Sequence, residues 1–423
     1  MIALQVIRDD PERVRRAIAR KGERPDAVDR LIAADSRRRV LLAEADGLKH
    51  ERNVGSRRVG DLLRDSRADE AAALKAQLAR LAERIGVLDA EIREIDAMVE
   101  RELLSIPNLP DERSPDGSGS ADNLEVRRRG EPARSRPPHW EIGERLGLFD
   151  LERAAKISGS GFILYTGAGA RLQRALVSLM VDLQATRHGY REVWPPILVN
   201  AASARGTGQL PDKEGQMYVV ERVDLYLIPT AEVPVTNVYR DEILAADALP
   251  IRLVAYSPCF RREAGAAGKD TRGLLRVHQF DKVEMVHFVR PEDSAATLDE
   301  LTAHAEAVLD ALELTYRVVE RCTADLGFAQ ARGYDLEAWA PGVGAWLEVS
   351  STSNYTDFQA RRMNIRYRPE PGARPELVHT LNGSGLGMSR TVAALLETHL
   401  QDDGSVRLPD GLRPYFGGVD RIG

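Results

Sequence analysis

Apolar residues at heptad spacing between residues 74 and 95 constrain the fold of this 423-residue chain more than any other feature. They are separated by alternating steps of four and three residues, the spacing with which one helix packs along another in a coiled coil. The series consists of Leu74, Leu78, Leu81, Ile85, Leu88, Ile92 and Ile95. It predicts one long helix with a single apolar seam.

A second, weaker seam precedes the first and predicts a partner for it. Its residues are Leu31, Leu41, Ala45, Leu48, Val59 and Leu62. The short break between the seams reads LLRDSRADEAAAL, in which Ser66 or Asp69 can cap a new helix. Two seams and a short break predict an antiparallel helical hairpin over about residues 26–104. Each helix of about 35 residues would be roughly 50 Å long.

The segments on either side of this hairpin look different. Residues 1–25 are expected to form a short strand or turn and then a small helix, with Asp9 or Asp10 as its cap and Pro11 in its first turn. Pro, Ser, Gly and Asp crowd the stretch SIPNLPDERSPDGSGSADN, which predicts a linker or irregular loop. We therefore expect an N-terminal domain at 1–105, a linker at 106–138 and a second domain at 139–423.

The second domain alternates β-rich runs with helical stretches. Helices are expected near 168–188 and 293–313 and over the final SRTVAALLETHL. Successive strands between separate helices predict an α+β fold on an antiparallel sheet. The chain has no G-x-G-x-x-G or Walker A motif, which argues against a Rossmann or P-loop nucleotide site. The β-rich runs lie at 162–166, 190–199, 226–239, 253–260, 277–289 and 345–355.

Composition excludes several classes of protein. A net charge of −6 argues against general adhesion to nucleic acid or membrane, although local basic patches remain compatible with it. The only two cysteines, Cys259 and Cys322, lie far apart and favour neither a disulfide framework nor a zinc site. No apolar run approaches the roughly 18 residues that span a bilayer. We expect a soluble cytoplasmic protein.

One basic stretch, residues 258–286, stands out against this acidic background. It reads PCFRREAGAAGKDTRGLLRVHQFDKVEMV, two strand-like runs around a Gly- and Ala-rich loop. Arginine presents a flat, permanently charged fork to phosphate or carboxylate oxygens, and Phe280 could stack on a base. The alternative is a solvated basic hairpin with Phe280 in the core. The cations are Arg261, Arg262, Lys269, Arg272 and Arg276.

A second anion site is predicted near the C-terminus. Arg390 stands at the start of a helix after the Gly-rich stretch LNGSGLGMS, which we expect to be a turn. Helix N-termini favour anions, and a fixed arginine strengthens such a site. Two cationic sites in one domain favour a nucleotide polyphosphate as the ligand.

The two basic segments resemble motifs 2 and 3 of the class II aminoacyl-tRNA synthetases, at 258–286 and 381–398. YREVWPPILVN, near 190–200, is similar to motif 1, the dimer-interface segment, with Pro196 as its proline. The runs GTGQLP, LIPTAEVPVTN, LEVSSTSNYTDFQARRMNIRYR and HTLNGSG together resemble seryl-tRNA synthetase, over essentially the whole chain. The resemblance implies a homodimeric ligase that activates L-serine with ATP and Mg²⁺. It then esterifies the 3′ end of tRNA(Ser), and of tRNA(Sec) where present.

The resemblance also implies roles for individual residues. Arg261 would bind the α-phosphate and Arg390 the γ-phosphate, while Phe280 and Glu263 would contact the adenine. Glu348 would be the main magnesium ligand, with Ser351, and carboxylate with phosphate oxygens is normal magnesium chemistry. The resemblance implies that Arg261, Arg390 and Glu348 are the catalytic residues. The ATP-binding set adds Arg262, Glu263, Val277, Phe280, Val349, Ser350 and Ser351.

Serine recognition is expected from the segment Thr230, Ala231 and Glu232, which is similar to the family's T-x-E signature. An ammonium group needs a buried carboxylate, which Glu232 or Glu284 can supply. A polar group aimed at the substrate hydroxyl would reject alanine by up to roughly 10⁴-fold. The remaining expected contacts are Ser384, Asn382 and Thr380.

The resemblance implies that the helical hairpin binds the long variable arm and elbow of tRNA(Ser) through phosphate contacts, which read shape and not base sequence. The alternative is a coiled coil that only dimerises. Basic residues concentrate on its first helix. The tRNA-binding candidates are Arg37, Arg38, Arg39, Lys49 and Arg52.

Departures from the family pattern remove none of the predicted ligands, and they are the only hint of a paralogue in place of a housekeeping enzyme. Asp212, Lys213 and Glu214 replace a run that usually contains an aromatic residue, and Arg262 and Thr352 replace a common serine and cysteine. A paralogue serving antibiotic resistance or biosynthesis would keep the same chemistry. An amino acid:carrier-protein ligase would lack the hairpin, and a non-catalytic RNA-binding homologue would have lost its charged residues.

Overall fold

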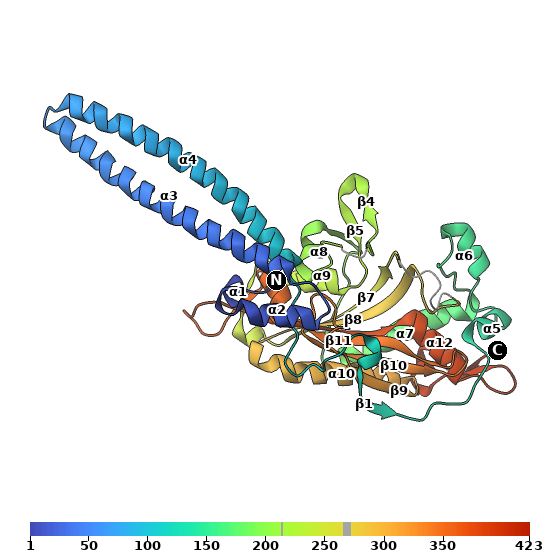
Figure 1. The fold of residues 1–423 in the computed structure, drawn as a ribbon. Coiled ribbons are helices and arrows are strands. Elements are labelled where there is room, and N and C mark those ends of the chain that lie inside the picture. Colours follow the sequence, from blue (N-terminus) through green and yellow to red (C-terminus); the bar gives the residue numbers. More distant parts are fainter. Residues whose placement is uncertain (213–214, 265–271) are drawn as a thin grey trace. The chain divides into compact units, whose positions relative to one another are not determined.

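The structure of the chain is a computed structural model that describes residues 1–212, 215–264 and 272–423 (Figure 1). Lys213, Glu214 and Lys269, which the sequence analysis singles out, lie outside these ranges. The chain divides into two compact units. One comprises Ile2–Ala19 and Glu23–Pro107, and the other comprises Met1, Arg20–Gly22 and Asn108–Gly423. None of the described helices has the length and hydropathy needed to cross a membrane.

The first helices of the chain include one that the sequence analysis misses. Residues Leu4–Asp9 form α1, where a strand or turn was predicted, and Pro11–Arg20 form α2. Tertiary contacts outweigh the weak local preference of α1. Its Ile7 is fully buried, and Arg8 donates from Nε and Nη2 to the Asp35 carboxylate at 2.8 and 2.6 Å. The Asp10 cap of α2 is confirmed, because its carboxylate accepts from the Arg13 backbone N–H at 2.8 Å.

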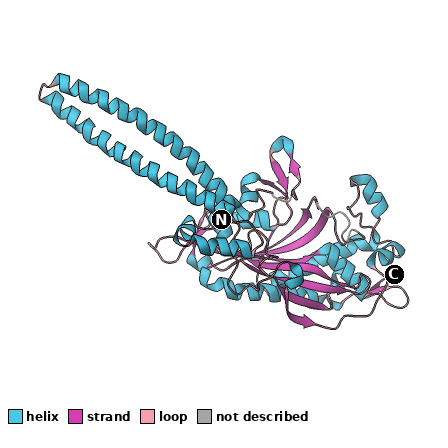
Figure 2. Ribbon diagram, in the orientation of Figure 1, coloured by secondary structure: helices cyan, strands magenta, loops and turns pink. Residues whose placement is uncertain are grey.

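The predicted hairpin is present as two helices of 39 and 38 residues, α3 (Asp26–Arg64) and α4 (Ala68–Ser105), drawn as paired long ribbons in Figure 2. Their seams meet in two hydrophobic clusters, one around Leu41 and Leu88 and one around Val59 and Leu62. The predicted cap is wrong. The N-cap is Arg67, without a side-chain hydrogen bond, because Ser66 adopts a left-handed turn conformation with φ of 61°.

The larger unit is built on an eight-stranded sheet in the order β1-β9-β10-β11-β14-β8-β7-β2. Its pairs are antiparallel except for β2 with β7, which confirms the α+β fold on an antiparallel sheet. The strands are β1 (Leu124–Arg129), β2 (Arg191–Val193), β7 (Ile251–Phe260), β8 (Gln279–Val289), β9 (Tyr316–Glu320), β10 (Arg332–Ala340), β11 (Ala345–Asn354) and β14 (His379–Gly387).

Smaller sheets flank this one, in the orders β13-β12-β6, β15-β16 and β3-β5-β4. Their strands are β3 (Leu198–Asn200), β4 (Val219–Val220), β5 (Leu225–Leu227), β6 (Ile243–Ala245), β12 (Arg366–Arg368), β13 (Glu376–Leu377), β15 (Val406–Arg407) and β16 (Arg421–Ile422). Short 3₁₀ helices form at Ser120–Asp122, Glu221–Val223, Asn237–Tyr239, Ala246–Ala248, Pro291–Asp293, Asp410–Leu412 and Pro414–Phe416.

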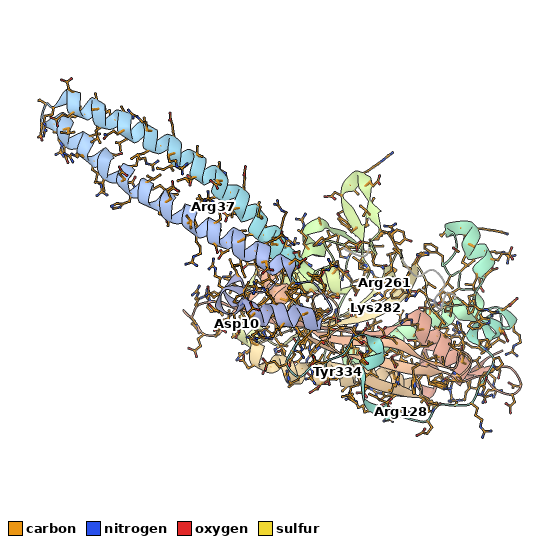
Figure 3. All side chains as sticks on the ribbon, in the orientation of Figure 1. Asp10, Arg37, Arg128, Arg261, Lys282 and Tyr334 are labelled. Atoms are coloured by element: carbon orange, nitrogen blue, oxygen red, sulfur yellow. The ribbon has the colours of Figure 1, made fainter. Side chains whose placement is uncertain are left out.

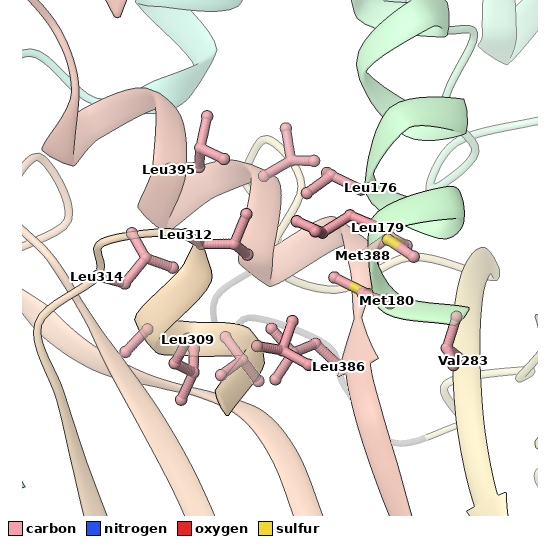
Figure 4. Close-up of a cluster of buried hydrophobic side chains, with 14 of the residues drawn as sticks. Leu176, Leu179, Met180, Val283, Leu309, Leu312, Leu314, Leu386, Met388 and Leu395 are labelled. Atoms are coloured by element: carbon pink, nitrogen blue, oxygen red, sulfur yellow. The ribbon is translucent and has the colours of Figure 1, made fainter. Parts of the chain in front are cut away.

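The core of this unit lies between the sheet and three long helices, all three near their predicted positions. Leu176 and Met180 of α7, Leu309 of α10 and Leu395 of α12 meet the sheet residue Val283 in one buried cluster (Figure 4). The helices are α5 (His139–Arg145), α6 (Leu151–Ser158), α7 (Gly167–Arg187), α8 (Ala201–Thr207), α9 (Glu232–Thr236), α10 (Ser294–Ala311), α11 (Phe358–Met363) and α12 (Met388–Thr398).

Three local predictions are wrong. The run 226–239, predicted as a strand, contains the helix α9. All five residues of α9 are buried, so its sequence shows no helical period and looks like that of a buried strand. Residues 162–166 form only an isolated bridge between Phe149 and Tyr165. The Gly-rich stretch before Arg390 is the buried strand β14 and not a turn. A Cβ at Gly383 would lie 2.8 Å from the Thr352 methyl group, so glycine permits close packing there.

The stretch predicted as a linker, 106–138, also differs from expectation. Its residues Leu124–Arg129 form β1, which pairs antiparallel with β9 at the edge of the large sheet. Every residue of β1 is exposed, so its sequence carries no apolar alternation that could have predicted a strand.

Candidate active site

The large sheet carries an open pocket of about 510 Å³. Three adjacent strands, β11, β14 and β8, supply much of its lining, and the segment after β7 and the start of α12 supply the rest. The pocket brings together residues that lie up to 181 positions apart, from Gln209 to Arg390. One end is rich in carboxylates and hydroxyls, and the other end carries arginines.

Alternation along β8 places three chemically different side chains on the pocket face. Phe280, Lys282 and Glu284 are two residues apart, and all three line the pocket. Side chains at this spacing project from the same face of a strand. Figure 3 labels Lys282 on β8 and Arg261 directly after β7.

The acidic end of the pocket is a buried hydrogen-bonded cluster. Thr230 Oγ1 donates to Glu284 Oε2 at 2.5 Å and accepts from Lys282 Nζ at 2.8 Å. Lys282 also forms an ion pair with Glu284. Glu284 is 1% exposed, so removing one member would leave a buried charge without its partner. The sequence analysis missed Lys282, although its spacing from Phe280 and Glu284 could have revealed it.

A second buried carboxylate faces the same end. Glu232 Oε1 accepts from Gln359 Nε2 at 2.6 Å, and Gln359 Oε1 accepts from Thr380 Oγ1 at 2.8 Å. Burial, with the Glu284 carboxylate nearby, raises the pKa of Glu232 to about 7. Two carboxylates and one ammonium leave one net negative charge in this end of the pocket when Glu232 is ionised.

The predicted serine contacts divide into two groups. Thr230, Glu232, Glu284, Ser384 and Asn382 line the pocket. Ala231 and Thr380 are fully buried and are not among the described lining residues. Thr380 reaches the pocket indirectly: its hydroxyl donates to Gln359, which bonds to Glu232, and its carbonyl accepts from the Tyr355 backbone N–H at 3.0 Å.

A tyrosine that the sequence analysis did not select completes the acidic end. Tyr355 lines the pocket and donates from its hydroxyl to Asn382 Oδ1 at 2.9 Å. The hydrogen bond fixes the orientation of the Asn382 amide, whose Nδ2 donors then face away from Tyr355. Nothing in the local sequence around Tyr355 distinguishes it from an ordinary core aromatic residue.

The cationic end is formed by two arginines on different elements. The Arg261 guanidinium lies 5.1 Å from the centre of the Phe280 ring, and its Nε donates to the Pro229 carbonyl at 3.4 Å. Arg390, in the first turn of α12, donates from Nε to the Leu275 carbonyl at 3.1 Å and from Nη1 to the Glu348 carbonyl at 3.0 Å. Both side chains are held by backbone oxygens and have further donors that can bind an anion.

The loop after β7 presents its two neighbouring residues differently. Glu263 lines the pocket, adopts a left-handed conformation with φ of 49° and forms a 3.2 Å ion pair with Arg276. Arg262 is exposed and is not among the described residues that line the pocket. Arg262 and Glu263 were both predicted to bind ATP, and the structure brings only Glu263 to the pocket.

Oxygen donors gather on β11 beside the arginines. Val349, Ser350 and Ser351 line the pocket together with Glu348, whose side chain is 48% exposed. Ser350 Oγ donates to the Ser384 carbonyl at 2.6 Å. Ser351 Oγ is buried without a hydrogen-bond partner among the described residues. An exposed carboxylate next to an unsatisfied hydroxyl is a donor set suited to a hard cation.

On the hairpin, the five predicted RNA-binding residues do not share one environment. Arg37 and Lys49 on α3 form ion pairs of 2.8 Å with Glu91 and Asp89 on α4, and Arg38 pairs with Asp96. Arg37 is labelled in Figure 3. Within the part of the chain that the structure describes, Arg39 and Arg52 form no side-chain ion pair, and Arg39 is exposed.

Two family profiles match the chain. The seryl-tRNA synthetase N-terminal domain matches residues 1–110, and the tRNA synthetase class II core domain (G, H, P, S and T) matches residues 218–399. Serine--tRNA ligase from Geobacillus kaustophilus is 52% identical over 425 residues and covers 100% of both chains. Serine--tRNA ligase from Listeria monocytogenes is 48% identical over 425 residues, covering 100% of this chain and 99% of its own.

Solved structures give the same picture. Seryl-tRNA synthetase from Pyrococcus horikoshii, complexed with ATP, superposes with a TM-score of 0.95 at 37% identity and covers 100% of this chain and 99% of that one. Cytoplasmic serine-tRNA ligase from Naegleria fowleri, in complex with AMP, gives a TM-score of 0.88 at 28% identity, covering 98% and 96%.

Proposed function

Because this chain belongs to the seryl-tRNA synthetase family, we propose that the arginine end of its pocket binds ATP and the carboxylate end binds L-serine. The enzyme is a serine--tRNA ligase: it forms seryl-adenylate and pyrophosphate from serine and ATP, and then transfers serine to tRNA. One observation carries the division of the pocket. Arg261 and Arg390 line one end of the 510 Å³ pocket, and the buried carboxylates of Glu232 and Glu284 line the other end.

The ATP end would work by positioning and charge neutralisation. Arg261 would hold the α-phosphate and Arg390 the γ-phosphate, with the adenine stacked on Phe280 and Glu263 at its edge. A serine carboxylate oxygen attacks the α-phosphorus, and the bond to the pyrophosphate oxygen breaks. An ionised carboxylate needs no general base, so fixed cations opposite the developing charge supply the catalysis.

Glu348 and Ser351 fit a magnesium ion that arrives with ATP. The Glu348 side chain is 48% exposed, with Arg390 Nη1 3.5 Å from its carboxylate, and Ser351 lines the same space. The described residues contain no cluster of three His, Cys, Asp or Glu side chains that could hold a metal. Phosphate and water oxygens would therefore provide most of the ligands. Mg²⁺ would neutralise phosphate charge when bound.

The carboxylate end would bind the serine ammonium group through Glu232 and Glu284. Its single net negative charge matches one ammonium, while Asn382 and Ser384 offer hydrogen bonds to the serine hydroxyl. Thr230, whose hydroxyl already bonds to Glu284, Lys282 and the Glu232 backbone N–H, would hold the carboxylate in place. The buried polar groups would remain unpaired with alanine in the site, which supports discrimination against that amino acid.

The serine half of the pocket makes the enzyme sensitive to mild acid. Protonation of Glu232, whose pKa is raised to about 7, removes the net negative charge that attracts the ammonium. We therefore expect kcat/KM for serine in pyrophosphate exchange to fall about tenfold per pH unit below 7 and to level off above it. The dependence should disappear in Glu232→Gln. A flat profile in the wild-type enzyme between pH 5.5 and 7.5 would contradict the assignment.

Glu284→Gln should damage the use of serine selectively. A hydrogen bond to a charged group contributes about 1.5–3 kcal/mol, so KM for serine should rise by roughly 10- to 100-fold. KM for ATP should change less than about threefold, since the carboxylate lies at the other end of the pocket. Steady-state exchange with each substrate varied in turn checks this. A selective rise in KM for ATP would overturn the role.

The same proposal extends to the RNA and to a second copy of the chain. The helical hairpin would bind tRNA(Ser), and tRNA(Sec) where present, with Arg39 and Arg52 as phosphate contacts, since Arg37, Arg38 and Lys49 are already paired. A homodimer would bury the exposed segment around Pro196, where Trp194 is 75% exposed. We place the enzyme in the cytoplasm with the translation machinery.

The test of the whole assignment is serine-dependent ATP–pyrophosphate exchange followed by aminoacylation of tRNA(Ser). Exchange without aminoacylation would favour a carrier-protein ligase, and neither activity would favour a non-catalytic RNA-binding homologue. Both activities together, at ordinary rates, are the expected result.

A further inference from the structure

His139, the first residue of α5, lies outside the pocket and contacts two elements that shape it. It is fully buried. Its Nε2 accepts a hydrogen bond from the Leu274 backbone N–H at 3.0 Å, and its Nδ1 lies 2.8 Å from Glu397 Oε1. A nitrogen that accepts carries no proton, so the neutral ring holds its proton on Nδ1 and donates it to Glu397.

Glu397 gives the histidine a fixed anchor. It is fully buried on α12, seven residues or about two turns after Arg390. Four donors converge on its carboxylate: the His139 ring, the His139 backbone N–H at 2.9 Å, and the backbone N–H groups of Gly342 and Val343 at 2.7 and 3.1 Å. A carboxylate held by this many donors cannot swing to another partner without leaving them unpaired.

The same helix holds the next residue of the basic segment directly. Arg390 Nε donates to the Leu275 carbonyl at 3.1 Å. Two consecutive residues, Leu274 and Leu275, are therefore fixed to α12, one through His139 and the other through Arg390. The residues that follow, Arg276 and Val277, line the pocket.

We infer that His139 is a positioning residue for ATP binding, which sets Arg276 and Val277 at the cationic end of the pocket through Leu274. The inference rests on the proposed assignment of that end to ATP. The Glu397–His139–Leu274 chain would keep this segment in a fixed position relative to Arg390, which binds the γ-phosphate in the proposed site.

The fit between His139 and the segment is close, which argues for a specific contact. Gly273 has a left-handed φ of 66°, and a Cβ built on it would lie 2.4 Å from His139 Nε2. Next to it, the Arg272 guanidinium lies 4.6 Å from the centre of the Trp140 ring, on the residue after His139. Any side chain at position 273 would push the segment away from the histidine.

Two substitutions of His139 separate its contacts. His139→Gln can place Oε1 where Nε2 lies and accept from Leu274, whereas His139→Asn is too short to reach Leu274 and keeps only the donor to Glu397. We expect kcat/KM for ATP in pyrophosphate exchange to fall about tenfold in the Asn variant and less than about threefold in the Gln variant. KM for serine should stay within twofold in both, and their thermal unfolding midpoints should agree within about 2 °C.

Gly273→Ala should disrupt the contact between His139 and the Leu274 backbone by changing the segment and not the histidine. It should lower kcat/KM for ATP as His139→Asn does, and the double variant should lose no more than the worse single one, because both remove one interaction. Should neither His139 variant fold, Gly273→Ala decides alone: a selective loss on ATP supports the inference, and wild-type kinetics overturn it.

Equal kinetics in the Asn and Gln variants, or additive losses in the double variant, would also overturn it. Arg261→Ala and Arg390→Ala, measured in parallel, separate this failure from that of the ATP site itself. If they lose exchange while His139→Asn does not, only the positioning role is wrong.

Discussion

Alanine at Arg261 or at Arg390 is expected to lower the rate of serine-dependent pyrophosphate exchange by roughly 10²–10³-fold. One well-placed contact to developing charge contributes about 2.7–4 kcal/mol, which corresponds to this factor. The two guanidinium groups approach the pocket from the end of β7 and from the start of α12, so neither can replace the other. Exchange at saturating ATP and serine is the measurement.

The chain offers a matched control for this experiment. Arg262 follows Arg261 directly, carries the same charge and is exposed outside the described lining of the pocket. Arg262→Ala should therefore retain exchange within about threefold, as ordinary surface substitutions do. Thermal unfolding must confirm that all three variants are folded. Wild-type exchange in Arg261→Ala or Arg390→Ala would remove the basis of the ATP assignment.

Removal of the helical hairpin should separate the two half-reactions of the enzyme. We expect a protein with residues 27–104 replaced by a short linker to keep pyrophosphate exchange within a few fold. Its kcat/KM for tRNA should fall on the order of 10³-fold, because a handful of phosphate contacts contributes that much affinity. The hairpin packs on itself through two clusters of its own, around Leu41 and Val59, so the other unit keeps its core.

Salt provides the control for the hairpin experiment. Charging by the full-length enzyme should weaken steeply between 50 and 200 mM salt, because RNA binding releases many condensed counterions. Exchange, which involves no RNA, should change much less. Charging by the truncated enzyme at near-normal efficiency would mean that the hairpin is a plain coiled coil. Loss of exchange together with charging would mean that the truncation damaged the catalytic unit, and a longer linker would then be required.

Long periodic patterns were predictable from the sequence, and short ones were not. The heptad seams led directly to α3 and α4, because one apolar position per turn repeats over many turns. α1 and α9 contain six and five residues, too few to establish a period, and both form because buried contacts such as that of Ile7 outweigh local preference. β1 was missed for the opposite reason, because all of its residues are exposed.

The pocket was predictable to the extent that its residues lie in recognisable segments. Arg261, Phe280, Glu284 and Arg390 were selected from two short runs, and all four line the pocket. His139 could not be selected in this way. Its partners Leu274 and Glu397 are 135 and 258 residues away, and only the folded chain brings them together. A similarly long separation in sequence explains why Gln359 was not linked to Glu232, which lies 127 residues before it.

The strand order of the large sheet has a consequence for how the protein is made. β14 lies between β11 and β8, yet its residues, His379–Gly387, leave the ribosome after those of every other strand of that sheet. Until they emerge, the nascent chain holds two partial sheets, β1-β9-β10-β11 and β8-β7-β2, each with an open edge that can pair wrongly. The hairpin, whose contacts are local, can fold long before. The sheet that carries the pocket is thus completed by one of its inner strands, almost at the end of translation.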